Sequence, residues 1–206
     1  MNIIDADITK NAAGAELHVT AYSPTLGWRE VALSKVEYIV PPQDGLQEFV
    51  LGGTPPSGSA LTSIMTYSLT APMPAADWVR GARIKNPAGK TLLVLGTLVK
   101  GKDPIGQDWV AIENAGIKGD KLILEVKYGG GCQRHSFQLA WDGSVIKTEP
   151  PQLQLSLTHN GNGDPCKALL AEQLQFDLSL LIDAPADYVL RVNSGITEVI
   201  AHTPTN

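Results

Sequence analysis

The apolar residues of this chain recur at every second position over short stretches, with polar residues at the positions between them. The clearest stretches are residues 122–128, 135–141, 153–157 and 174–180. Successive side chains of a β-strand point to opposite faces of a sheet, so a period of two predicts strands with one buried face. The pattern therefore predicts an all-β, mainly antiparallel protein.

Segments rich in Gly, Pro, Asn and Asp separate these stretches, among them "PPQDG", "NPAGK", "WDGS" and "HNGNGDP". Such turns at fairly even spacing are typical of antiparallel sandwiches, and about a dozen strands fit between them. We expect two β-sandwich-like units, residues 1–100 and 101–206, with a linker candidate at residues 95–109. Little helix is expected, at most one short turn at residues 167–172.

Composition and charge exclude several classes of partner. The 206 residues are 43% hydrophobic and 18% charged, as in a folded globular protein. A net charge of −5 and the lack of a Lys/Arg cluster argue against nucleic acid as a partner. No apolar run reaches the roughly 18 residues of a membrane-spanning helix, and the start "MNIIDADITKNAAG" lacks a signal-peptide pattern. The sequence therefore predicts a soluble chain with no membrane span.

The candidate chemistry lies between residues 132 and 166, and the two histidines there each end an apolar strand face. His135 is in phase with Phe137, and His159 is in phase with Leu157. If the two stretches form an antiparallel pair, a register centred on Lys147 aligns the apolar faces and sets His135 opposite His159. A shift of two residues would keep the faces and separate the histidines.

The only two cysteines, Cys132 and Cys166, flank these histidines and allow three interpretations. The favoured one is a disulfide, which would raise the free energy of unfolding by about 3 to 4 kcal/mol on the chain-entropy model. The second is a tetrahedral zinc site made by Cys132, His135, His159 and Cys166. In the third, Cys132 is a nucleophile with either histidine as its base and glycine amides as an oxyanion hole. The spacing leaves all three open, and no catalytic residue is assigned.

The segment "HNGNGDPC" places Asn160, Asn162 and Asp164 at alternate positions, as a calcium loop would. Pro165 and Ala171 occupy positions at which such a loop needs glycine and glutamate. Asn-Gly and Gly-Asp are also ordinary turn sequences, so we interpret the segment as a turn.

Two stretches, "YGGGCQRHSFQLAWDG" and "PPQLQLSLTHNGNGDPCKALLAEQLQFDLSLL", contain the motifs Gly-Gly-Cys-x-x-His-x-Phe and His-Asn-x-Asn-Gly-Asp-x-Cys. They resemble a pattern in uncharacterised bacterial proteins, many of them predicted lipoproteins or secreted proteins. By this resemblance Cys132, His135, His159 and Cys166 are the motif residues. It is confined to the C-terminal half and implies a location in the cell envelope or exterior, with the cytoplasm as the alternative because the chain shows no signal or lipobox.

The sequence as a whole favours a non-enzymatic protein. We expect a binding or structural β module, secreted or held in the bacterial envelope, with an unidentified protein or small molecule as its ligand. A zinc-binding protein is the alternative, and a thiol-dependent enzyme comes third. Apart from zinc, no cofactor is indicated.

Overall fold

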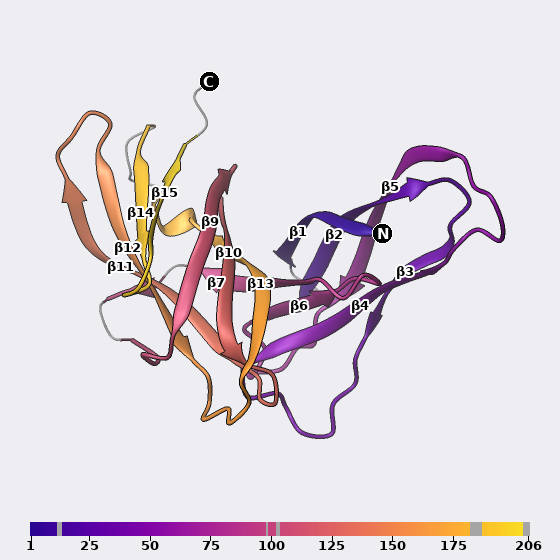
Figure 1. Cartoon of the computed structure of the whole chain (residues 1–206), viewed down its shortest axis with the longest axis horizontal. Coiled ribbons are helices and arrows are strands. Elements are labelled where there is room, and N and C mark those ends of the chain that lie inside the picture. Colours follow the sequence, from indigo (N-terminus) through magenta and orange to yellow (C-terminus); the bar gives the residue numbers. More distant parts are fainter. Residues whose placement is uncertain (12–13, 98, 102–103, 182–186, 204–206) are drawn as a thin grey trace. The chain divides into compact units, whose positions relative to one another are not determined.

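Figure 1 shows the chain as a computed structural model that describes residues 1–206 except 12–13, 98, 102–103, 182–186 and 204–206. Strands make up most of the described chain, and its only helical element is a short 3-10 turn, η1, at Ser179–Leu181. The all-β prediction is therefore confirmed, with strands in both antiparallel and mixed sheets. Among the described residues, no helix is long and apolar enough to span a membrane.

The strands gather into two compact units, Met1–Val94 and Leu95–Asn206, which we call the N-terminal and C-terminal units. That residues 1–100 and 101–206 are separate domains stays a prediction. In the N-terminal unit, the sheet β1-β2-β5 is antiparallel throughout. Its other strands follow the order β3-β4-β6-β7, in which β4 and β6 are parallel. The bounds are β1 Asn2–Asn11, β2 Gly14–Thr25, β3 Arg29–Lys35, β4 Leu46–Thr54, β5 Thr62–Pro72, β6 Gly81–Lys85 and β7 Thr91–Thr97.

The core of the N-terminal unit forms where the alternating apolar faces of these strands meet. Leu17 of β2, Phe49 and Leu51 of β4 and Ile84 of β6 are fully buried in one cluster. Burial of side chains of this size supplies the main free energy that holds such sheets together.

The C-terminal unit carries all four residues of the predicted motif. Three of its strands follow the order β13-β10-β9, and a five-stranded sheet has the order β15-β14-β12-β11-β8. The pairs β12·β14 and β11·β8 are parallel. The bounds are β8 Val99–Lys100, β9 Val110–Lys118, β10 Lys121–Gly130, β11 Ser136–Ile146, β12 Gln152–Asn160, β13 Ala168–Asp177, β14 Val189–Asn193 and β15 Glu198–His202.

The helical turn expected at residues 167–172 is wrong, because strand β13 begins at Ala168. β13 pairs with β10 along its whole length, from Gly130 opposite Ala168 to Lys121 opposite Asp177. This ladder provides hydrogen-bond partners for the backbone groups of the segment and buries Leu174. Pairing with β10 therefore overrides the helical preference of "KALLAEQL".

The predicted faces of β11 and β12 are confirmed, but their predicted register is wrong by two residues. Phe137, and not His135, lies opposite His159, and Trp141 lies opposite Leu155. The two strands stay paired as far as Ile146, which moves the connection toward the prolines at residues 150–151. Between Trp141 and Val145 an irregularity adds two residues to β11, so the register changes along the pair. The apolar face of β12 stays buried over its whole length, whereas Val145 and Ile146 of β11, beyond the irregularity, are exposed.

Candidate functional site

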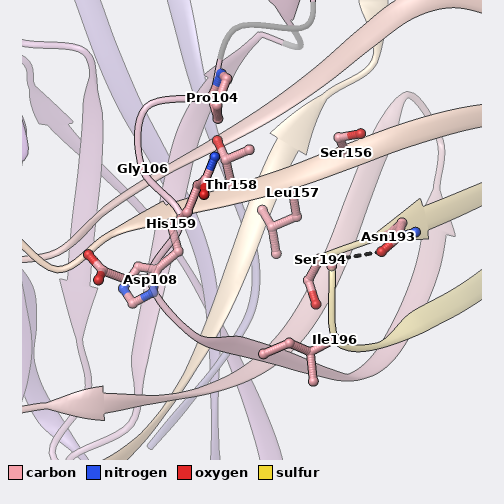
Figure 2. Close-up of a pocket in the computed structure, with 12 residues that line it drawn as sticks. Pro104, Gly106, Asp108, Ser156, Leu157, Thr158, His159, Asn193, Ser194 and Ile196 are labelled. Atoms are coloured by element: carbon pink, nitrogen blue, oxygen red, sulfur yellow. Dashed lines mark hydrogen bonds between the residues drawn. The ribbon is translucent and has the colours of Figure 1, made fainter.

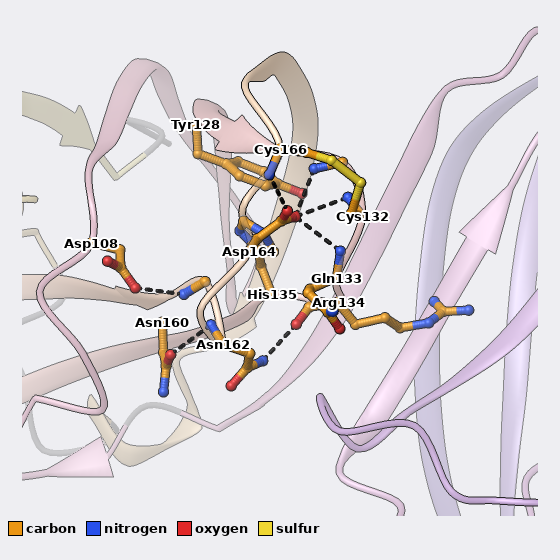
Figure 3. Close-up of polar contacts among 12 residues, drawn as sticks. Asp108, Tyr128, Cys132, Gln133, Arg134, His135, Asn160, Asn162, Asp164 and Cys166 are labelled. Carbon is orange, nitrogen blue, oxygen red and sulfur yellow. Dashed lines mark hydrogen bonds and ion pairs between the residues drawn. A yellow bond between two sulfur atoms is a disulfide. The ribbon is translucent and has the colours of Figure 1, made fainter.

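One end of the C-terminal unit brings together the loop after β10, the start of β11 and the loop after β12 (Figure 3). Cys132 and Cys166 form a disulfide with their Cα atoms 5.7 Å apart. Gly130 of β10 and Ala168 of β13 form the pair at one end of their ladder. The disulfide therefore joins the segments that adjoin these two strands just beyond that end. His135 and His159 lie beside it, and all four predicted residues therefore belong to one site.

Asp164 lies at the centre of this site, and its side chain is only 2% exposed. Its Oδ2 atom accepts three consecutive backbone N–H groups, those of residues 131–133, at 2.8, 2.9 and 2.9 Å. The same oxygen lies 3.0 Å from Nε2 of His135, and Oδ1 accepts the N–H of Cys166 at 2.8 Å. A single carboxylate thus links the two strand ends that the disulfide also joins.

These contacts keep Asp164 ionised. Burial by itself would raise the pKa of the carboxyl group, because a low-polarity surrounding disfavours charge. The opposing hydrogen bonds, from the N–H groups of Gln133 and Cys166, the His135 ring and the N–H of Cys132, outweigh burial and hold the pKa of Asp164 well below its usual range. The site therefore contains a buried negative charge that is stabilised by hydrogen bonds from the protein.

The two histidines continue the hydrogen-bond network from Asp164 into the sheet. Nδ1 of His135 lies 2.8 Å from Nε2 of His159, and Nδ1 of His159 lies 3.0 Å from the carbonyl oxygen of Trp109. The two residues are 3% and 2% exposed. They are not directly opposite each other in the ladder, because His135 precedes the first paired residue of β11 by one position. Their rings nevertheless meet, with 4.9 Å between centroids and 29° between planes.

Aromatic side chains enclose the histidine pair. The ring of Phe137 is stacked on that of His159, with 4.8 Å between centroids and 8° between planes. The ring of Tyr128 contacts both histidines, with centroids 4.8 and 5.0 Å away. The Tyr128 hydroxyl points to Glu172, at 2.7 Å from its Oε2 atom. This packing shields the network from water and fixes the orientation of both rings.

The environment of His159 disfavours a positive charge on its ring. Burial lowers the pKa of His159, and the charge of His135 lowers it further. The hydrogen bond to the Trp109 carbonyl and the carboxylate of Asp108 act in the opposite direction but are weaker. Burial and the neighbouring ring of His135 therefore disfavour a positive charge on His159.

Two glycines allow the His135 ring to lie where it does. A Cβ atom on Gly130 would lie 2.5 Å from the ring atoms Cε1 and Nε2 of His135, far inside van der Waals contact. A Cβ on Gly161 would come within 3.3 Å of the same ring. The glycine preceding the cysteine loop is thus needed for the close approach of a side chain, and not only for the bend.

The chemistry of the oxidised site differs from that of a zinc centre or a thiol enzyme. Sulfur atoms in a disulfide are neither thiolate ligands nor nucleophiles. Two nitrogens bound to one tetrahedral zinc ion would lie roughly 3.3 Å apart, whereas the facing nitrogens of His135 and His159 are hydrogen-bonded at 2.8 Å. Zinc binding by Cys132, His135, His159 and Cys166 stays a prediction.

A cavity of about 450 Å³ lies next to the network within the C-terminal unit (Figure 2). Its wall is formed by residues 156–159 of β12, by the segment around Asp108, and by the turn between β14 and β15. The Asp108 N–H donates to the carbonyl of His159 at 3.1 Å, and the Asp108 carboxylate accepts the N–H of Gly161 at 2.7 Å. The lining side chains are mainly uncharged and polar, among them Ser156, Thr158, Asn193 and Ser194.

Sequence reasoning missed the residues that join the predicted ones. Asp164 was interpreted as a turn residue, and Asp108 and Trp109 lie about 50 positions from the histidine that they contact. A signal for Asp164 was present, because it occupies a fixed place in the pattern His-Asn-x-Asn-Gly-Asp-x-Cys. No signal in the sequence points to Trp109, which contributes only a backbone carbonyl.

No family model and no curated protein matches this chain. Among solved structures it is similar to a toxin-related protein from Parabacteroides distasonis, with 16% identity, 92% of this chain and 93% of that chain covered, and a TM-score of 0.43. A NigD-like immunity protein from Bacteroides caccae has 16% identity over 84% and 91% of the two chains, with a TM-score of 0.42. A protein of unknown function from Bacteroides vulgatus has 14% identity over 100% and 90%, with a TM-score of 0.46.

Proposed function

We propose that this protein is a non-enzymatic binding or structural β module of the bacterial cell envelope or exterior, and that the cavity beside β12 receives its ligand. The observation that carries the proposal is that the buried polar network reaches an open cavity through one of its members, His159. Asp108 also lines this cavity, and it holds the neighbouring segment through its N–H, which donates to the carbonyl of His159, and its carboxylate, which accepts the N–H of Gly161.

The hydrogen bonds of the motif residues favour a structural role for them rather than a catalytic one. Asp164 accepts hydrogen bonds at both oxygens, and each histidine uses both ring nitrogens within the network. Groups that are buried and engaged in this way hold backbone segments in place, as second-layer residues do around a binding site. The cavity wall is then the part that meets a ligand.

The disulfide supports a location outside the cytoplasm. Disulfides persist in oxidising compartments and are rare where thiol reductants are abundant. The resemblance of the Cys/His pattern to predicted lipoproteins and secreted proteins points in the same direction. After fractionation of the bacterial cells, the chain should therefore be found in the periplasm or exterior, with a mass two protons below that of the reduced chain. A chain found in the cytoplasmic fraction with two alkylatable thiols would contradict this location.

The cavity suits a ligand that forms hydrogen bonds and has an apolar part. Ser156, Thr158 and Ser194 carry hydroxyl groups that donate and accept, whereas Leu157 and Ile196 add apolar surface. Its volume is within the range of small-molecule sites, roughly 300 to 1,000 Å³. Either a polar small molecule or a side chain of a protein partner fits this description.

Binding in the cavity can be tested by thermal shift with a panel of sugars, amino acids and dipeptides. Ser156 is exposed on β12 and lines the cavity, so Ser156→Trp should obstruct it without disturbing the core. Gln154→Trp is the matched control, because Gln154 is exposed on the same face of the same strand but outside the cavity. A compound that stabilises the wild type and Gln154→Trp but not Ser156→Trp is expected. Equal stabilisation of all three proteins would place the ligand elsewhere.

A further inference from the structure

We propose that His135 and His159 together form a buried binding site for one proton, so that the pair carries a single positive charge that Asp164 balances. The inference goes beyond the proposed ligand cavity and does not depend on it. It follows from counting the protons that three hydrogen bonds in series require.

The two ends of the series can only accept hydrogen bonds. At one end is the carbonyl oxygen of Trp109, 3.0 Å from Nδ1 of His159. At the other is Oδ2 of Asp164, 3.0 Å from Nε2 of His135. Because Asp164 already accepts several N–H groups and is ionised, it has no proton to give. Both outer ring nitrogens must therefore carry a proton.

The inner contact needs a proton of its own. If both rings were neutral, the two outer N–H groups would use their only protons, and two lone pairs would face each other at the 2.8 Å contact between His135 and His159. Any other neutral arrangement moves this repulsion to the Trp109 carbonyl or to the Asp164 carboxylate. Three contacts require three protons and two neutral imidazoles supply two, so the closed network contains one more.

A second extra proton does not fit. Two imidazolium rings would place two N–H groups against each other across the same 2.8 Å contact. The lowered pKa of His159, which arises from burial and from the charge of His135, agrees with a pair that accepts one proton and resists another. The site thus has a fixed capacity of one extra proton, and the charge lies on His135, because that ring is 3.0 Å from the carboxylate of Asp164.

The charged and titratable groups around the pair favour this state. Asp164 faces it from the loop after β12, and Asp108 faces it from the segment before β9. From β10, Tyr128 contacts both rings, and its hydroxyl is turned toward Glu172 of β13. Two carboxylates near one imidazolium, inside an aromatic enclosure, are what a retained buried cation requires.

The experiment is a long-range nitrogen–proton NMR correlation on the full-length, ¹⁵N-labelled protein with its disulfide intact. At about pH 7.5, one unit above the ordinary histidine pKa of about 6.5, the expected spectrum shows both ring nitrogens of His135 protonated. His159 should be neutral with its proton on Nδ1, so that the pair bears three N–H groups. Exposed His202 serves as the internal reference. Two neutral rings, or two rings that titrate independently, would overturn the proposal.

An uncharged counterpart tests the charge balance. Asp164→Asn keeps the size of the side chain but removes its negative charge, and the pair should then lose the extra proton at the same pH. If folded Asp164→Asn still shows an imidazolium, the balance by Asp164 is refuted. If this variant does not fold, the wild-type spectrum alone decides whether the third proton is present, because it needs no substitution.

Discussion

At the scale of single residues, Asp164 matters through the number of donors that converge on it. Asp164→Asn should lower the urea midpoint of unfolding at pH 7, because an amide oxygen cannot hold three backbone N–H groups and a ring nitrogen with the strength of a carboxylate. Asp120→Asn, in the exposed turn between β9 and β10, is the size-matched control.

The effect of Asp164→Asn on stability should also depend on pH. The pKa of Asp164 is depressed in the folded protein, so its stabilisation is fully present above the unfolded-state pKa of about 3.9 and is lost gradually as the pH falls from there through the much lower folded-state pKa. The difference in urea midpoint between the wild type and Asp164→Asn, measured from pH 7 to pH 3, should therefore be constant down to about pH 5 and begin to narrow below about pH 4. A constant difference over this range would show that the charge of Asp164 is not responsible.

The lowered pKa of His159 should produce a second effect of pH on stability. Its pKa is lowered in the fold, whereas an unfolded histidine has a pKa of about 6.5, so the unfolded chain binds more protons at acidic pH. The free energy of unfolding should fall as the pH decreases from about 6.5 to 5. This decrease should be smaller in His159→Gln, and His202→Gln should behave as the wild type. Chemical denaturation at each pH measures both slopes.

At the scale of the strands, Gly130 at the end of β10 determines whether the His135 ring fits. Gly130→Ala places a Cβ atom 2.5 Å from that ring and should lower the free energy of unfolding by about 1 to 3 kcal/mol, as overpacking of a tight site does. Gly129→Ala is the matched control, since a Cβ there meets nothing within 4 Å. Similar midpoints for the two variants would contradict the close approach.

The strands also show which parts of the architecture follow from local pattern. The alternation in "LQLSLTH" predicts the buried face that ends at His159, because a period of two is a property of any strand. The register of β11 with β12 does not follow, since a shift of two residues buries the same side chains. It depends on the bulge after Trp141 and on where the prolines end the pairing, neither of which hydrophobic spacing encodes.

At the scale of the whole molecule, the two units make a prediction about unfolding. If residues 1–100 and 101–206 fold as separate domains, denaturation should show two unfolding transitions. Loss of the disulfide should then shift the midpoint of only the transition that belongs to residues 101–206. Cys132→Ser/Cys166→Ser should lower the free energy of unfolding of the C-terminal domain by about 3 to 4 kcal/mol. Trp28 and Trp78 report on the first unit, and Trp109 and Trp141 report on the second.

Single-tryptophan variants followed by fluorescence during denaturation would separate the two transitions. A variant that retains Trp28 should have the same midpoint with and without the disulfide. A variant that retains Trp141 should shift with its loss. One common transition, displaced as a whole, would contradict independent domains.

The all-β class and the buried faces of the strands follow from the sequence alone, because side-chain alternation is a local property of the chain. The sequence also indicated the stretch that contains Cys132, His135, His159 and Cys166, which lie within one connected segment. The central position of Asp164 in this site, and the hydrogen bond of His159 to the Trp109 carbonyl at the end of the network, became visible only in the folded chain. These contacts depend on strand register and on loops that meet in space, and a single sequence records neither.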